Sequence, residues 1–143
     1  MKAKRSIHEP SRDEVDFSIL DVELTGYFPD SGDRVLEVGV VKVRGGAIVD
    51  SFNSLINPER PISPGAFYVN RISSQMVADA PKFFEIAPQL LEFLDSSVLA
   101  AYNSPFDMSF IETEFRLAGV RLPEFVVIDV LKLARTLLPG IKS

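Results

Sequence analysis

Three acidic residues lie at or just beyond the ends of two short apolar segments. Asp21 and Glu23 end the first segment, and Asp107 follows the second. A spacing of two in a β-strand places Asp21 and Glu23 on the same face. Carboxylates flanked by apolar residues need a cation, a proton or a strong hydrogen-bond donor. Oxygen ligands favour Mg²⁺ or Mn²⁺, so the pattern is typical of a divalent-metal site.

Each of these acids also has a purely structural interpretation, and the spacing alone leaves both open. Asp21 and Glu23 can be exposed acids at a strand end beside a turn. Asp107 fits the acid of a capping box in which Ser104 caps a helix and Pro105 is its first residue.

Other side chains near the same segments are weaker candidates. Glu37 lies among valines in the middle of a predicted strand and is interpreted as a buried, hydrogen-bonding acid. Asp129 either points at the same edge of the sheet or caps the last helix. Tyr27 and Phe28 either stack on a base or pack along their loop.

The hydrophobic pattern predicts the elements that position these acids. Two β-branched segments flank the hairpin signal Gly45-Gly46, so the first three strands form an antiparallel meander. Strands that alternate with helices follow, and right-handed crossovers make them parallel to the first strand. The fold class is therefore α/β with a mixed sheet, whose carboxyl edge gathers the three acids. The predicted strands are 15–23, 34–44, 47–56, 98–102 and 126–129, and the predicted helices are a short one capped by Ser73, 83–94, 105–118 and 130–138.

Composition excludes several kinds of chemistry. The 143 residues carry a net charge of −5, one histidine and no cysteine. Disulfides, thiolate metal sites, catalytic triads and two-histidine metal sites are therefore excluded. No apolar run has the roughly 18 residues of a membrane span, so we expect no membrane partner and a cytoplasmic location. Residues 1–14 are expected to form a flexible polar leader, and residues 15–143 one domain.

Four stretches in order resemble one family. LDVELTG is similar to the first motif of DEDD-superfamily exonucleases, D-x-E-x-T-G, and AYNSPFDMSFIETEF is similar to the second, H-N-x-x-F-D. INPERPISPGAFYVNRISSQMVADAP is similar to the segment that joins these motifs in the proofreading epsilon subunit of bacterial DNA polymerase III and its relatives, and DVLKLARTLLPG is similar to the stretch that precedes their third motif. The resemblance runs from about Val15 to Ser143 and identifies a member of the DEDDh-type 3′–5′ exonucleases.

The resemblance implies a ribonuclease-H-like fold and a metal-dependent exonuclease that removes nucleotides from the 3′ end of DNA in proofreading or repair. It implies two Mg²⁺ or Mn²⁺ ions as cofactors, with Asp21 bridging both, Glu23 binding one and Asp107 holding the other. The implied partners are a single-stranded 3′ end of DNA, with RNA as the alternative, and a DNA polymerase subunit. The implied substrate-binding residues are Leu24, Thr25, Gly26, Asn70, Asn103 and Phe106.

The chain departs from the family pattern at three points. Tyr102 and Asn70 stand where relatives usually have histidines, and the third motif, with its general-base histidine and fourth carboxylate, does not occur in the 143 residues. We therefore expect this chain to be an inactive or weakly active C-terminally truncated fragment. Two alternatives stay open: an RNA-trimming 3′–5′ exoribonuclease, and a non-catalytic module of the same fold that binds nucleic acid or a polymerase.

Overall fold

A computed structural model describes residues 15–138 and 140. The predicted leader, residues 1–14, lies outside the described residues. A five-stranded sheet forms the centre of the described part, with strand order β3-β2-β1-β4-β5. The strands are β1 (Phe17–Leu24), β2 (Val35–Arg44), β3 (Ala47–Leu55), β4 (Val98–Ala101) and β5 (Val127–Asp129).

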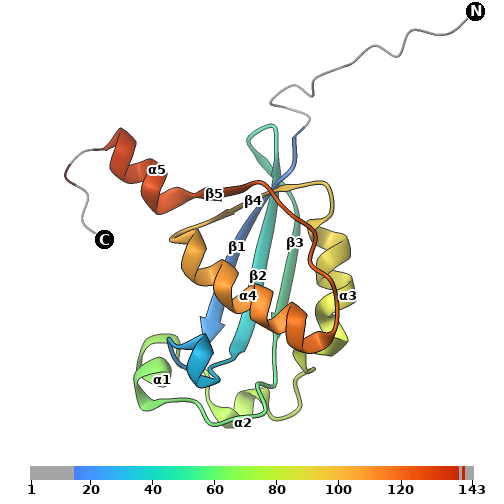
Figure 1. The fold of residues 1–143 in the computed structure, drawn as a ribbon, viewed down its shortest axis with the longest axis vertical. Coiled ribbons are helices and arrows are strands. Elements are labelled where there is room, and N and C mark those ends of the chain that lie inside the picture. Colours follow the sequence, from blue (N-terminus) through green and yellow to red (C-terminus); the bar gives the residue numbers. More distant parts are fainter. Residues whose placement is uncertain (1–14, 139, 141–143) are drawn as a thin grey trace, which may run out of the picture.

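The first three strands form the predicted antiparallel meander (Figure 1). β2 and β3 are joined by Gly45 and Gly46, whose φ angles are 58° and 77°. Two successive positive φ angles are those of a type I′ turn, which glycine adopts without steric cost. The hairpin prediction is therefore confirmed.

The last two strands are parallel to β1. β4 pairs with β1 from Phe17↔Val98 to Ile19↔Ala100, and β5 continues the sheet beyond β4. The mixed sheet, with two parallel strands after the meander, confirms the predicted fold class.

Two helices cover one face of this sheet, as Figure 1 shows: α3 (Phe83–Leu94) and α4 (Ser104–Ala118). Alternate residues of β1, including Leu20 and Val22, point into the core that the helices close. The intervening residues of β1, which include Asp21, lie on the opposite face. The side chain of Ile19 on that face is 45% exposed.

The smaller helices differ from the prediction at one place. α2 (Ser74–Val77) is capped by Ser73 as expected, whereas α1 (Pro64–Asn70) was not predicted. Ser63 caps α1 through a bond from the Ala66 amide, and proline follows the cap. A serine cap followed by proline is a strong helix-start signal. The helix was not expected because Gly65 and Val69 have low helix propensity. The remaining helical elements are the 3-10 turn η1 (Pro29–Ser31) and α5 (Val130–Leu137).

Pro88 lies within α3 without ending it. The helix keeps its predicted bounds because its apolar face is buried, with Ile86, Ala87 and Leu90 in the core. That burial offsets the single main-chain hydrogen bond that proline cannot donate. Among the helices that the structure describes, none is long and apolar enough to cross a membrane.

Candidate metal and nucleotide site

Asp21 and Glu23 project from the less covered face of β1. Their partners on β2 are Gly39 and Glu37, because β1 and β2 pair Asp21↔Gly39 and Glu23↔Glu37. Asp21 is exposed and Glu23 is half-buried. Burial, followed by the charges of Asp21 and Glu37, raises the pKa of Glu23 above its usual value. The strand therefore brings acids together without bringing a counter-charge.

Asp107 comes to this end of the sheet through β4 and α4. β4 runs parallel to β1, and α4 begins three residues after β4 ends. Asp107 lies in the first turn of α4 and is only 7% exposed. Burial, with the charges of Asp21 and Glu23, raises its pKa from 3.8 to about 7. A helix N-terminus favours an anion by only about 0.3–1 kcal/mol, so burial and like charge prevail here.

Carboxylate oxygens are ligands that a divalent cation prefers. In this structure, however, the three carboxylates are not arranged so that they surround an ion. Within the described residues, no three acid or histidine side chains are grouped closely enough to hold a metal ion. Asp21 and Glu23 nevertheless act electrostatically on Asp107. A buried oxygen donor whose charged neighbours are all negative is the environment that Mg²⁺ or Mn²⁺ would stabilise.

The structural interpretation of Asp107 as a capping acid is wrong. Asn103, not Ser104, is the N-cap of α4, and it forms no side-chain cap bond. Asn103 adopts a left-handed conformation with φ 55°, which asparagine tolerates, so the chain turns one residue earlier than predicted. Ser104 becomes the first, buried residue of the helix.

Asp129 and Glu37, two of the weaker candidates, lie in different surroundings. Asp129 caps α5 by accepting hydrogen bonds from the Leu131 and Lys132 amides at 3.1 and 3.4 Å. Its interpretation as an N-cap is therefore confirmed. Glu37 is half-buried and paired with Glu23 across the strands, where its charge raises the pKa of Glu23. It thus adds to the negative charge of this face.

Four of the predicted substrate-binding residues belong to the chain that surrounds the end of β1. Leu24 is a core side chain, 5% exposed, and Thr25 is fully buried. The Asn70 amide donates to the Leu24 carbonyl oxygen at 3.1 Å and accepts from the Ile72 amide at 2.9 Å. Gly26 is buried beside Asp33. These placements favour a role in shaping the loop, and direct nucleotide contact stays a prediction.

The remaining two predicted substrate-binding residues lie closer to solvent. Asn103 is exposed at the turn before α4, and Phe106 is half-buried on the first turn. The ring centroids of Phe106 and Tyr27 are 6.5 Å apart. Tyr27 and Tyr102 are 47% and 59% exposed. Aromatic side chains therefore flank the acids on both loops.

Sequence reasoning missed two residues that hold this region together. Asp33 accepts hydrogen bonds from the loop after β1, and Arg34 forms a bidentate pair with buried Glu114 at 2.6 and 2.8 Å. The sequence around Asp33, YFPDSGD, is typical of a turn and does not single out this acid. The available signal was two adjacent residues of opposite charge, Asp33 and Arg34, directly before a β-branched strand.

The chain belongs to the exonuclease family. Residues 18–143 match the sequence profile of the RNase T-type family, described as "Exonuclease". This match covers the sheet, α3, α4 and all three carboxylates. The family assignment follows from the sequence match, and the fold described above agrees with it.

Related proteins carry this domain within longer chains. A PolC-type DNA polymerase III of Caldanaerobacter subterraneus is 38% identical over 130 residues, which are 91% of this chain and 9% of that protein. A DNA polymerase III subunit epsilon of Rickettsia felis is 37% identical over 87% of this chain and 56% of its own length. A structure titled exonuclease X in complex with 5′-overhanging duplex DNA is 32% identical, with a TM-score of 0.69, and covers 88% of this chain and 66% of that chain.

Proposed function

We propose that this chain is a metal-dependent 3′–5′ exonuclease domain that acts on the single-stranded 3′ end of DNA. The observation that carries the proposal is Asp107, a buried carboxyl whose pKa is raised to about 7. Its charged neighbours, Asp21 and Glu23, are themselves acids. A carboxylate group of this kind destabilises the fold unless a cation binds to it. The family to which the chain belongs gives that cation a function.

Asp21, Glu23 and Asp107 would hold the divalent ions. Bound Mg²⁺ or Mn²⁺ would polarise the phosphodiester and lower the pKa of water, so that hydroxide is available as the nucleophile near neutral pH. The chain's own contribution is to supply oxygen ligands from two rigid elements, β1 and α4. The loop after β1 and the first turn of α4 would orient the terminal nucleotide, with Tyr27 and Phe106 beside the bases.

The biological setting is part of the same proposal. Relatives named as DNA polymerase III subunits, and a neighbour bound to overhanging duplex DNA, support DNA as the substrate and a polymerase as the partner. They also support a location in the cytoplasm. A net charge of −5 argues against a broad duplex-binding surface, because each neutralised phosphate needs a lysine or arginine. A short strand end fits this charge better.

A single-turnover nuclease assay tests the proposal. Protein in excess is incubated with Mn²⁺ and 5′-labelled single-stranded DNA, in parallel with the ribo-oligonucleotide of the same sequence. In keeping with the weak activity expected from the sequence, we expect the DNA to shorten slowly and stepwise from its 3′ end, and Asp21→Asn to abolish the shortening. Asp50→Asn is the matched control, because Asp50 is an exposed acid on β3.

Three results would contradict this assignment in different ways. Equal degradation by the Asp21→Asn variant would remove the metal site from the reaction. Faster turnover of the ribo-oligonucleotide would make the protein an exoribonuclease. Tight binding of the oligonucleotide by the wild type and by Asp21→Asn, with no turnover by either of them, would identify a non-catalytic binding module.

A further inference from the structure

The loop between β1 and β2, residues 25–34, closes around the carboxylate of Asp33. Asp33 Oδ1 accepts a hydrogen bond from the Thr25 hydroxyl at 3.0 Å. Asp33 Oδ2 accepts one from the Phe28 amide at 3.1 Å. The two oxygens therefore bind the beginning and the middle of the loop, and they fix its path by charge-assisted hydrogen bonds.

Thr25 and Gly26 are matched to this carboxylate. The Thr25 hydroxyl also accepts from the Arg34 amide at 2.9 Å, and the residue is fully buried. A Cβ atom on Gly26 would lie 2.4 Å from Asp33 Oδ2, well inside van der Waals contact. Glycine is therefore required at position 26 because Asp33 occupies the space that any side chain would need.

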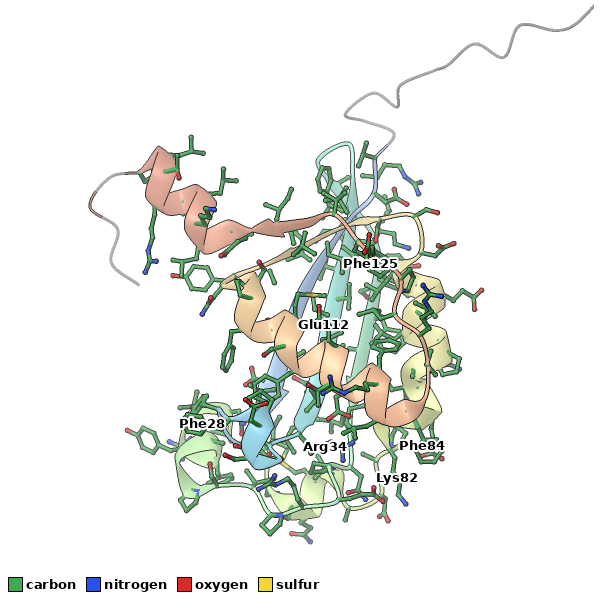
Figure 2. The ribbon with its side chains drawn as sticks, viewed as in Figure 1. Phe28, Arg34, Lys82, Phe84, Glu112 and Phe125 are labelled. Atoms are coloured by element: carbon green, nitrogen blue, oxygen red, sulfur yellow. The ribbon has the colours of Figure 1, made fainter. Side chains whose placement is uncertain are left out.

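Asp33 and the adjacent Arg34 each contact another part of the fold. Arg60 places a guanidinium nitrogen 3.7 Å from Asp33 Oδ1. The next residue, Arg34, binds Glu114 of α4 through two hydrogen bonds, and it lies below that helix in Figure 2. The Asp33-Arg34 pair thus connects the loop after β1 to the helix that carries Asp107.

The outer side of the same loop displays two aromatic rings. Tyr27 and Phe28 are 47% and 67% exposed, and Phe28 is labelled in Figure 2. The Tyr27 ring lies against Phe106, next to Asp107 in the sequence. Exposed aromatic side chains bind unpaired bases by stacking, and they do so best when their position is fixed before binding.

We propose that Asp33 is a positioning residue for the nucleic acid: it holds residues 25–28 in the shape that presents Tyr27 and Phe28 to unpaired bases at a 3′ end. The inference rests on the proposed function and deepens it. Asp33 acts through the loop, because its own carboxylate is engaged with Thr25 and Phe28.

The test compares Asp33→Asn with Asp30→Asn, an exposed acid in the same turn. Hydrogen exchange at residues 25–28 reports on the loop without any ligand. Fluorescence anisotropy with a short 5′-labelled oligodeoxythymidine in Ca²⁺ reports on binding. The asparagine keeps the size of the side chain but replaces one acceptor oxygen with a donor, so its two terminal atoms cannot both accept from the Thr25 hydroxyl and the Phe28 amide. We expect faster exchange in the loop and about tenfold weaker binding, as for the loss of a hydrogen bond to a charged group.

Thr25→Val and Thr25→Ser provide an independent pair. Valine removes the hydroxyl that bonds Asp33, whereas serine retains it. We expect valine to reproduce the faster loop exchange of Asp33→Asn and serine to keep the slow loop exchange of the wild type. In single-turnover degradation by Asp33→Asn, the protein concentration for half-maximal rate should rise with little change in the maximal rate. A merely structural role would instead change the thermal unfolding midpoint without this separation.

The outcomes separate the two proposals. A wild-type protein that binds no oligonucleotide would overturn the proposed function, and this inference with it. Wild-type binding that Asp33→Asn leaves unchanged would overturn the positioning role alone. So would weaker binding without faster loop exchange, because the effect would then not pass through the loop.

Discussion

Two buried acids on α4 have opposite surroundings. Glu114 and Asp107 are 2% and 7% exposed, and they lie seven residues apart, close to two helical turns. Glu114 binds the Arg34 guanidinium through both carboxylate oxygens and also accepts from the Val35 amide. The charged side chains that act on Asp107 are Asp21 and Glu23, and both are acids.

This difference separates an acid that the fold itself neutralises from one that it leaves among like charges. Burial of a charge is costly in both places. At Glu114 the fixed cation of Arg34, the residue before β2, offsets the cost, and the pair raises the pKa of Arg34 in turn. At Asp107 the carboxyl has lost water and faces negative charge, so its pKa rises to about 7. The fold satisfies the first acid itself, and under the proposed function a metal ion would satisfy the second.

The largest expected effect comes from breaking the satisfied pair. Arg34→Met should lower the free energy of unfolding by about 3–5 kcal/mol, because Glu114 would remain buried without its partner. The double variant Arg34→Met/Glu114→Leu should recover most of this loss. Urea unfolding followed by circular dichroism measures both. A double variant as unstable as the single one would show that the cost does not arise from the orphaned charge.

Supplying a cation to the unsatisfied acids should have the next largest effect. Mn²⁺ at about 100 times its dissociation constant should stabilise the wild type by about 2.7 kcal/mol. Asp21→Asn should abolish this stabilisation. Thermal unfolding with and without chelator gives the measurement, and Asp50→Asn serves as the control. Equal stabilisation of the Asp21 variant by Mn²⁺ would place the ion elsewhere.

Removing the buried charge at Asp107 should stabilise the protein in chelator, and only at higher pH. Because the folded pKa of Asp107 is raised from 3.8 to about 7, the folded state binds more protons than the unfolded state between these values. Stability from this group is therefore present at low pH and lost as pH rises towards about 7. Asp107→Asn should match the wild type near pH 4 and exceed it by about 1–2 kcal/mol above pH 7. A difference independent of pH would contradict the assignment.

The smallest effect is expected at an acid that is paired in solvent. Asp16 binds Arg44 at 2.6 and 2.9 Å, and this pairing lowers its pKa, but the pair lies at the surface. Solvent screens such pairs strongly. Asp16→Asn should leave the unfolding free energy within the error of urea titration. A loss of unfolding free energy comparable to that of Arg34→Met would mean that losing an ion-pair partner destabilises the protein even when the acid is not buried.

Much of the fold follows from local pattern. The β-branched segments around Gly45-Gly46, the apolar periodicity of residues 83–94 and the glycine after residue 118 were sufficient to predict the hairpin, α3 and the end of α4. These signals are short-range, because they depend on turn conformations and on which face of one element is apolar. Predictions failed where two local signals competed, as at α1 and at the cap of α4.

The sequence by itself determined which acids are candidates and, through the motifs, the family to which they belong. Only the tertiary structure decided what each acid does. Asp33, Glu114 and Asp107 are all carboxylates, and residue type does not separate them. Their surroundings differ. A turn of the same loop brings a hydroxyl and an amide to Asp33, whereas segments far apart in sequence bring a guanidinium to Glu114 and negative charge to Asp107. The free energy of a buried charge depends on those partners, and residue type alone does not specify them.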